Sequence, residues 1–317
     1  MNVLITGASG FIGRTLCNTL ADKGHMVRGI FRSPEKLIKY KINMDCVSIG
    51  EIGPNTDWME ALRGIDVIVH LAARVHVMKD STADPLSEFR KMNLDATEHL
   101  AKMSANAGVK RFVFMSTVKV NGEQTENKPF HETDIPRPED PYAVSKWEAE
   151  QALYKISKET GLEVVILRPP LVYGQGVKAN FLRLLQIVDH NIPLPFMNVY
   201  NQRSLIYLGN LVDAIITCCT HPNVKAETFL VSDGEDVSTP ELIKMIASVM
   251  GKKAKLFPFP QSLLKIMGTL IGNKEELDRL LRSLCIDSSK IRKVLNWTPP
   301  FSIREGINET VKSYKSR

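Results

Sequence analysis

The feature that most constrains the fold is a glycine-rich turn placed directly after the first apolar run. Residues 2–6 have the composition of a buried strand, and an amphipathic stretch runs from the turn to Gly24. The turn carries its glycines at three-residue spacing: Gly7, Gly10 and Gly13. In a strand–turn–helix unit the first glycine permits the tight turn, the second lets the backbone approach a pyrophosphate, and the third allows close helix packing. The helix N-terminus meets the phosphate charge. The sequence therefore predicts a dinucleotide site, with GxxGxxG rather than GxGxxG spacing.

Strand-like and helix-like segments alternate after this unit. Strands are expected at residues 26–31, 45–49, 66–70, 111–115 and 163–168, and helices at 58–62, 85–107 and 142–160. Repeated strand–helix units predict an α/β fold with a Rossmann-type, doubly wound parallel sheet and right-handed crossovers. Ligands bind such sheets beyond the carboxyl ends of the strands. Small and polar residues gather at those ends, among them Ala72, Ala73, Ser116 and Thr117.

The pattern loosens after Pro170. A strand at 203–207 precedes a helix at 210–219, followed by a strand at 228–232, a helix at 240–250 and an amphipathic stretch at 263–284. We expect a nucleotide-binding domain at 1–170 and a smaller, mostly helical C-terminal substrate lobe at 171–317, with some segments returning to the first domain. The 263–284 stretch is interpreted as core or a partner surface, with a membrane surface as the alternative.

Composition excludes several classes of function. With 44% hydrophobic and 24% charged residues, the chain should be globular and soluble. The five cysteines are odd in number and lack CxxC spacing, so neither a disulfide framework nor a metal site is expected, and a cytoplasmic location fits. The first predicted strand begins almost at Met1, so no leader peptide is expected. The sequence has no run of 18 apolar residues, so no integral membrane segment is expected. The net charge of +6 is scattered, which favours anionic small molecules or a membrane surface over nucleic acid.

A phenol and an ammonium stand four residues apart, in Tyr142 and Lys146. Asp140 is a good N-cap and Pro141 suits the first helical position, so both side chains should share one face of a new helix. A tyrosine pKa of roughly 10 falls when an ammonium and a helix N-terminus favour the phenolate. Tyr142 is therefore predicted to exchange a proton with an alcohol/ketone pair. The alternative is an exposed helix start with an ordinary polar pair.

The end of the second predicted strand bears on cofactor choice. An acidic residue there would bind the ribose diol of NAD, but this chain has Phe31, followed by Arg32 and Ser33. A guanidinium and a hydroxyl suit a 2′-phosphate. NADP(H) is therefore favoured, with NAD(H) possible. The alternative for Arg32 is a solvated loop arginine.

Together these features resemble the extended short-chain dehydrogenase/reductase superfamily, whose members act largely on nucleotide sugars, and the resemblance covers essentially the whole chain. It implies that Thr117, 25 residues before the tyrosine, hydrogen-bonds the reacting oxygen, with Ser116 as its neighbour, and that Lys146 holds the nicotinamide ribose. The cofactor contacts it implies or allows are Gly7, Ser9, Gly10, Phe11, Ile12, Gly13, Phe31, Arg32, Ser33, Leu71, Ala72, Ala73, Asn93, Tyr142, Lys146 and Pro169. The substrate contacts are Lys119, Asn180 and Arg203.

Within this superfamily the sequence looks most like the bacterial 4-ketoreductases that make UDP-N-acetylquinovosamine for surface polysaccharides. The resemblance implies NADPH-dependent reduction of the C4 ketone of a UDP-4-keto-6-deoxy-N-acetylhexosamine. The alternative is an NAD-dependent UDP-sugar 4-epimerase. Val118 and Lys119 replace the Asp-Glu pair of 4,6-dehydratases, and Lys119 either contacts substrate or extends into solvent. A homodimer through the helices at 85–107 and 142–160 is also expected.

Overall fold

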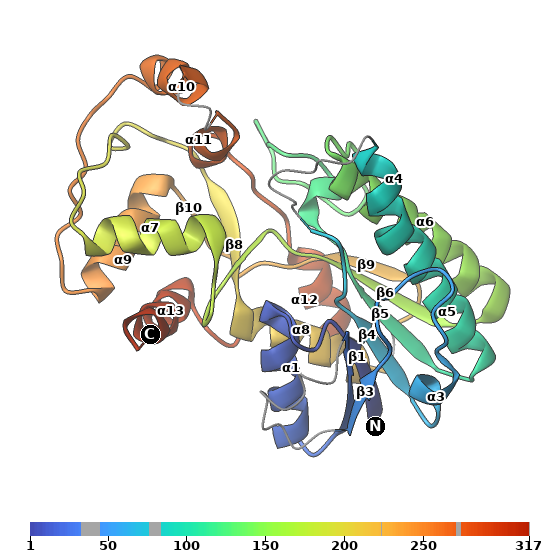
Figure 1. The fold of residues 1–317 in the computed structure, drawn as a ribbon. Helices are drawn as coiled ribbons and strands as arrows, with labels where there is room; N and C mark the ends of the chain where they lie inside the picture. Colours follow the sequence, from blue (N-terminus) through green and yellow to red (C-terminus); the bar gives the residue numbers. More distant parts are fainter. Residues whose placement is uncertain (33–44, 76–83, 223, 271–273, 317) are drawn as a thin grey trace.

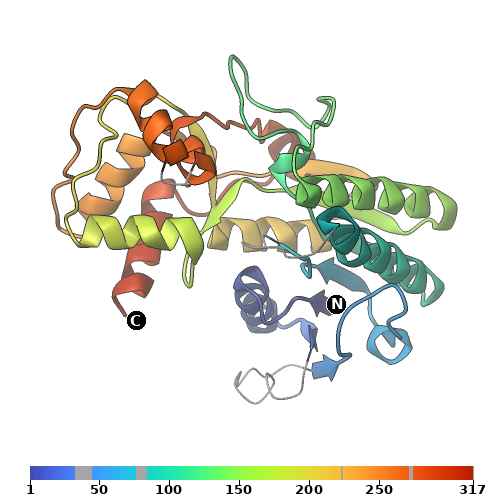
Figure 2. The same ribbon diagram turned by 45° about the horizontal axis from the view of Figure 1, so that its top comes forward.

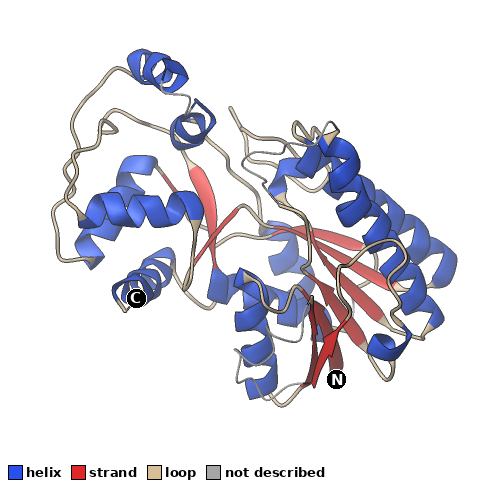
Figure 3. Ribbon diagram, in the orientation of Figure 1, coloured by secondary structure: helices blue, strands red, loops and turns tan. Residues whose placement is uncertain are grey.

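Seven parallel strands form the main sheet of this protein, seen in a computed structural model that describes residues 1–32, 45–75, 84–222, 224–270 and 274–316. The strands are β1 (Asn2–Thr6), β2 (Met26–Phe31), β3 (Asp45–Ser48), β4 (Val67–His70), β5 (Arg111–Met115), β6 (Glu163–Arg168) and β9 (Glu227–Leu230). Their order is β3-β2-β1-β4-β5-β6-β9, and each neighbouring pair is parallel (Figures 1 and 3). The predicted doubly wound sheet is confirmed. Every residue of β4 and β5 is buried, as expected for strands covered on both faces.

Helices cover the two faces of this sheet (Figures 1 and 2). One face packs against α1 (Phe11–Asp22) and α8 (Leu208–Thr220), whose Leu16, Leu20 and Ile215 are fully buried. The opposite face packs against α3 (Met59–Leu62), α5 (Ala96–Asn106) and α6 (Pro141–Thr160). The helix α12 (Ser289–Leu295) contributes Ile291 and Leu295 to the first of these two cores. Each face is therefore closed by apolar side chains.

The helix predicted at 85–107 is interrupted. It consists of α4 (Pro85–Arg90), a π-helical turn (Lys91–Asp95) and α5. Asn93 lies in this turn and is fully buried, where its side chain bonds the main chain of Arg74 at 2.8 and 3.0 Å. A π-helical turn adds a residue to a helix and commonly marks a position with a special contact. Here the contact ties the helix to the loop that follows β4.

A smaller lobe is built around a three-stranded sheet of order β10-β8-β7. Its elements are β7 (Leu171–Tyr173), α7 (Ala179–Asp189), β8 (Arg203–Tyr207), β10 (Asp236–Val237), α9 (Thr239–Val249), α10 (Gln261–Leu270), α11 (Lys274–Leu281) and α13 (Ile303–Lys315). Its core includes Phe181, Ile246 and Ile307. The predicted 263–284 stretch becomes two helices, of which Leu264 and Leu281 enter this core while Ile266 is exposed. Among the described helices, none is long and apolar enough to span a bilayer.

One side chain of the main sheet fastens the second half of the chain to it. Arg111 on β5 donates to Glu163 at 2.7 Å. The same guanidinium donates to the carbonyl oxygens of Cys218, Cys219 and His221, each at 2.9 Å. These carbonyls belong to the end of α8, where helical C=O groups lack partners within the helix. Arg111 therefore caps a helix more than a hundred residues away in sequence.

Candidate active site

The glycine turn makes a cradle at the carboxyl end of β1. Gly7 has φ +70°, and a Cβ added there would lie 2.9 Å from the Ala72 nitrogen. At Gly13 an added Cβ would lie 2.2 Å from the Gly7 carbonyl oxygen, closer than real Cβ contacts allow. Within the described residues, no side chain caps α1 at Gly10. The N–H groups at the start of α1 are therefore directed at the cradle, as anion binding requires.

A 340 Å³ cavity lies over this cradle and collects most of the predicted cofactor residues. Thr6 holds its far wall in place, because its Oγ1 accepts from the nitrogens of Leu71 at 3.2 Å and Ala72 at 3.1 Å. The lining includes the predicted Gly7, Ser9, Gly10, Phe11, Ile12, Gly13, Phe31, Arg32, Leu71, Ala72 and Ala73. It also includes residues that the sequence did not single out, Ile30, Gly50, Ile52, Val75 and Met92. Ser33 lies outside the described residues.

The end of β2 faces this cavity as predicted. Phe31 is buried and Arg32 is exposed, and both line the cavity. The lining contributed by the described residues contains no carboxylate. The predicted Asn93, Tyr142, Lys146 and Pro169 lie outside this lining. Asn93 instead bonds Ser145 of α6 at 3.0 Å, and the Pro169 carbonyl accepts from the Val118 nitrogen at 3.0 Å.

The helix α6 begins where its capping residues predict. Asp140 caps it by accepting from the Ala143 nitrogen at 2.6 Å, and Pro141 occupies the first helical position. Tyr142 and Lys146 follow one turn apart, so they share a face. Lys146 is only 1% exposed, and its Nζ lies 3.7 Å from the centre of the Phe114 ring on β5. A cation over an aromatic face is stabilised by the ring quadrupole.

Burial controls both ionisable groups of this pair. Desolvation raises the pKa of Tyr142 well above its ordinary value, and the nearby Asp140 carboxylate raises it further. Desolvation lowers the pKa of Lys146 to about 7, and the Glu150 carboxylate partly opposes that shift. The prediction that the Tyr142 pKa is lowered is therefore wrong for this structure, because removal from water and the Asp140 carboxylate both raise it. These surroundings favour the protonated form of Tyr142.

The two hydroxyl candidates on the loop after β5 have different surroundings. Ser116 is buried and donates to the carboxylate of Glu150, which also receives Arg168 Nη2 at 2.5 Å. Thr117 accepts from the Lys119 nitrogen at 3.3 Å and keeps its own proton to donate. Ser116 therefore supports a buried ion pair, while Thr117 is the better candidate for contact with a reacting oxygen.

Lys119 lies between two carboxylates. Its Nζ lies 2.6 Å from Glu123 and 2.5 Å from Asp140, and its side chain is 17% exposed. The lysine therefore does not extend freely into solvent, and its contact with substrate stays a prediction. It ties the loop after β5 to the start of α6.

A second cavity, of 290 Å³, lies in the smaller lobe and contains both Asn180 and Arg203, the predicted substrate residues. Burial and the neighbouring Arg279 lower the pKa of Arg203. Arg203 donates to the carbonyl oxygens of Arg279 at 2.5 Å and Arg282 at 3.1 Å. Arg183 and Arg279 also line this cavity, and the described lining contains no carboxylate. Neither arginine was predicted, because only the packing of α7 and α11 brings them to β8. Clustered guanidiniums without a carboxylate suit a dianion.

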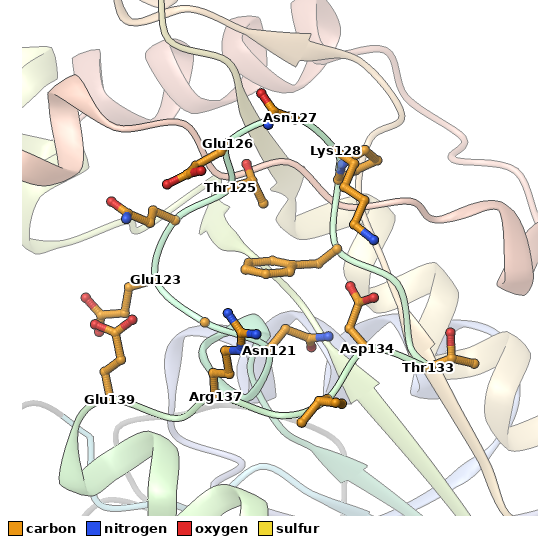
Figure 4. Close-up of a pocket in the computed structure, with 15 residues that line it drawn as sticks. Asn121, Glu123, Thr125, Glu126, Asn127, Lys128, Thr133, Asp134, Arg137 and Glu139 are labelled. Atoms are coloured by element: carbon orange, nitrogen blue, oxygen red, sulfur yellow. The ribbon is translucent and has the colours of Figure 1, made fainter.

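A third cavity, of 660 Å³, is lined by residues of the single loop 121–139 (Figure 4). Figure 4 shows carboxylates at several points along this loop, on Glu123, Glu126, Asp134 and Glu139. Their charge outweighs that of the two cations in the lining, Lys128 and Arg137. An excess of carboxylates repels phosphate groups. This cavity is therefore a poor site for a nucleotide.

Comparison with known proteins adds to this geometry. The NAD dependent epimerase/dehydratase family matches residues 3–232. The UDP-glucose 4-epimerase of Vibrio cholerae is 41% identical over 318 aligned residues, which cover 99% of this chain and 95% of that protein. The N-acetyl-alpha-D-glucosaminyl-diphospho-ditrans,octacis-undecaprenol 4-epimerase of Escherichia coli O157:H7 is 26% identical and covers 98% of this chain and 94% of that protein. The UDP-N-acetylglucosamine 4-epimerase from Bacillus cereus has the same fold, with a TM-score of 0.81, 20% identity and 99% coverage of both chains.

Proposed function

This chain belongs to the NAD dependent epimerase/dehydratase family, and on that premise we propose that it is an NAD-dependent UDP-sugar 4-epimerase. The similarity to a UDP-glucose 4-epimerase over nearly the whole chain supports this reaction and substrate class. The epimerase was the alternative reading of the sequence, and it now has more support than the 4-ketoreductase that the sequence favoured.

The observation that carries the substrate class is the arginine-lined cavity of the smaller lobe. Arg203 is positioned by main-chain carbonyls rather than by a carboxylate, and Arg279 lies close enough to disfavour its charge. An anion bound between two like positive charges offsets the repulsion between them. A diphosphate bearing a nucleoside and a sugar meets this requirement, and the apolar side chains of Phe181 and Phe196 line the same cavity.

The residues around the first cavity fit a dinucleotide. A Cβ at Gly7 or Gly13 would collide with the backbone of Ala72 or Gly7, so glycine lets the turn close tightly beneath the N-terminus of α1, where a pyrophosphate would bind. When bound, the nicotinamide supplies acceptance and return of a hydride. The residues for this group would be those of the β1–α1 turn and the loop after β4, which line the cavity, together with Lys146 on α6, which the family resemblance implies.

The roles of the protein groups follow from their surroundings. Tyr142, in its phenolate form, takes the proton of the C4 hydroxyl, and the phenol so formed returns the proton to the C4 oxygen after the sugar has turned over. Thr117 donates a hydrogen bond to that oxygen. The Lys146 ammonium, buried beside Tyr142, stabilises negative charge on the phenol oxygen, although burial leaves its pKa at about 7. Turnover should therefore depend on pH near neutrality.

An epimerase returns the hydride it removes, so it needs no added cofactor. Purified protein should interconvert UDP-glucose and UDP-galactose, measured by chromatography, and release close to one NAD(H) per chain on denaturation. Protein that carries bound NAD(H) but leaves UDP-glucose and UDP-N-acetylglucosamine unchanged would exclude these substrates. The release of no nicotinamide nucleotide, with turnover only on addition of NADPH and a 4-keto sugar, would exclude the epimerase.

One observation favours a second candidate, the NADPH-dependent reduction of a UDP-4-keto-6-deoxy-N-acetylhexosamine. The cavity lining at the end of β2 has Phe31 and Arg32 and no carboxylate, which suits a 2′-phosphate.

The homodimer through α4, α5 and α6 also remains a prediction. Sedimentation velocity of the purified chain measures it directly.

A further inference from the structure

Large apolar side chains are exposed along one edge of the smaller lobe. They come from two segments, the connection after α7 and the stretch that leads into α10 and includes the first turns of that helix. We name this the lobe-edge surface, made of Ile192, Met197, Tyr200, Phe257, Leu263 and Ile266. Tyr200 is 82% exposed and Ile266 is 56% exposed. Contiguous exposed apolar side chains usually mark an interaction site.

Hydrogen bonds hold the two segments side by side. The Leu194 nitrogen donates to the Lys255 carbonyl at 2.8 Å, and the Phe257 nitrogen donates to the Leu194 carbonyl at 3.1 Å. Gln261 at the start of α10 donates to the Asn198 carbonyl at 2.8 Å. Figure 1 shows α10, in orange, at the outer edge of this lobe, away from the seven-stranded sheet. The two segments that carry the lobe-edge surface are therefore adjacent in the fold.

The charge of these two segments has a single sign. Residues 190–202 and 251–270 contain no Asp or Glu, although the chain as a whole has 35 acidic residues. The same segments contain Lys252, Lys253, Lys255 and Lys265. Lys252 pairs with Asp189, whereas Lys253 and Lys255 are exposed. An apolar face with lysines and no carboxylates is the composition of a helix that lies in a lipid headgroup layer.

We propose that the lobe-edge surface docks this protein on an anionic lipid bilayer, with α10 in the headgroup layer. Apolar side chains enter the boundary of the acyl chains, and each lysine near the surface adds about 1 kcal/mol of attraction to anionic lipids. A second copy of the chain is a poorer occupant, because two such surfaces would bring lysines against lysines. Leu194 and Phe196 of the same segment line the arginine-rich cavity. The bilayer would therefore lie against the outer side of that cavity wall.

Vesicle flotation tests this proposal on the full chain without any need for turnover. We expect binding to vesicles of equal parts phosphatidylglycerol and phosphatidylcholine, and little binding to phosphatidylcholine alone. The variant Leu263→Ser/Ile266→Ser should lower the partition coefficient about tenfold or more, because it removes apolar groups that the bilayer would bury. Lys253→Glu/Lys255→Glu should lower it similarly, and added salt should weaken wild-type binding.

Matched controls change the same chemistry elsewhere on the surface. Met59→Ser removes an apolar side chain that is 73% exposed on α3, and Lys23→Glu/Arg63→Glu makes the same change in charge. Both controls should bind vesicles as the wild type does. Absence of binding to anionic vesicles overturns the proposal, as does equal loss in the controls. A wild-type dimer that Leu263→Ser/Ile266→Ser converts to monomers, without any vesicle binding, would assign the surface to a second copy instead.

Discussion

Lys119 Nζ lies 2.5 Å from Oδ2 of Asp140, while Oδ1 of the same carboxylate caps α6 at the Ala143 nitrogen, 2.6 Å away. Asp140 precedes Tyr142 by two residues and raises its pKa. Lys119 therefore partly neutralises a charge that acts on the proposed proton carrier. The pair also anchors the start of the helix that carries both Tyr142 and Lys146.

This relationship predicts opposite effects of two substitutions on the pH dependence of kcat/KM. Lys119→Gln should move the limb assigned to Tyr142 to higher pH, because the Asp140 carboxylate then acts unopposed. Asp140→Asn should move it to lower pH, and asparagine still caps the helix. Glu123→Gln is the control and should move it little. Shifts in the same direction for both variants would show that the pair acts only through the position of α6.

Tyr142→Phe removes the phenol oxygen and little else. Turnover should fall by roughly two to four orders of magnitude, because general acid–base catalysis contributes about that much. The affinity for UDP, measured by calorimetry, should hardly change. Near-normal turnover in this variant would rule out Tyr142 as the proton carrier.

Arg203→Ala should weaken UDP binding and leave the affinity for NAD(H) unchanged. A hydrogen bond to a charged group contributes about 1.5 to 3 kcal/mol, so the dissociation constant for UDP should rise roughly tenfold to a hundredfold. Arg304→Ala, at an exposed position on α13, is the control. Loss of nucleotide cofactor affinity with unchanged UDP affinity would contradict the assignment of Arg203.

Arg32 tests the choice of cofactor. Arg32→Ala should raise the dissociation constant for NADPH about tenfold or more at fixed salt, because the 2′-phosphate loses a charged partner. The constant for NADH should hardly change, since that cofactor offers only a hydroxyl. Equal changes for both cofactors would show that Arg32 does not read the 2′ position.

His70 predicts a loss of stability on acidification. Its Nδ1 lies 2.7 Å from Thr6 Oγ1, which already accepts two N–H groups and so donates its proton to the ring, and its Nε2 lies 3.0 Å from Thr97 Oγ1. The ring is therefore neutral, and burial lowers the pKa of His70 from 6.5 to about 3. As pH falls from 6.5 towards 3, the unfolded state binds a proton that the folded state refuses, so stability declines.

The slope for this histidine is about 1.4 kcal/mol per pH unit inside that window. We measure the free energy of unfolding by urea between pH 6.5 and pH 5. Its slope with pH should be smaller in His70→Gln, by the contribution of one bound proton. His190→Gln, at an exposed position, is the control substitution. An unaltered slope in His70→Gln would show that the ring already accepts a proton in the folded protein.

The features that could be predicted from sequence are local ones. Each of these features is determined by a few adjacent residues. They are the strand and glycine turn at Gly7, the cap at Asp140 and the apolar runs of β4 and β5. Patterns of this kind depend on backbone geometry and periodicity, which neighbours in sequence determine. The doubly wound sheet followed from their repetition.

The features that could not be predicted depend on groups brought together from distant segments. Arg279 reaches the cavity of Arg203 through the packing of α11, and Ser116 meets Glu150 through the packing of α6 on β5. The sign of the Tyr142 pKa shift was wrong for the same reason, because sequence spacing reports a nearby charge but not the loss of water. Burial is a property of the folded chain.

The cap that Arg111 places on α8 determines how the protein comes apart. A chain that stopped at residue 170 would lack β9 at the sheet edge and α8 over one sheet face, and would leave the Arg111 guanidinium without three of its acceptors. The first 170 residues are therefore part of a larger folding unit, and the sheet and the segments that return to it should melt in a single transition.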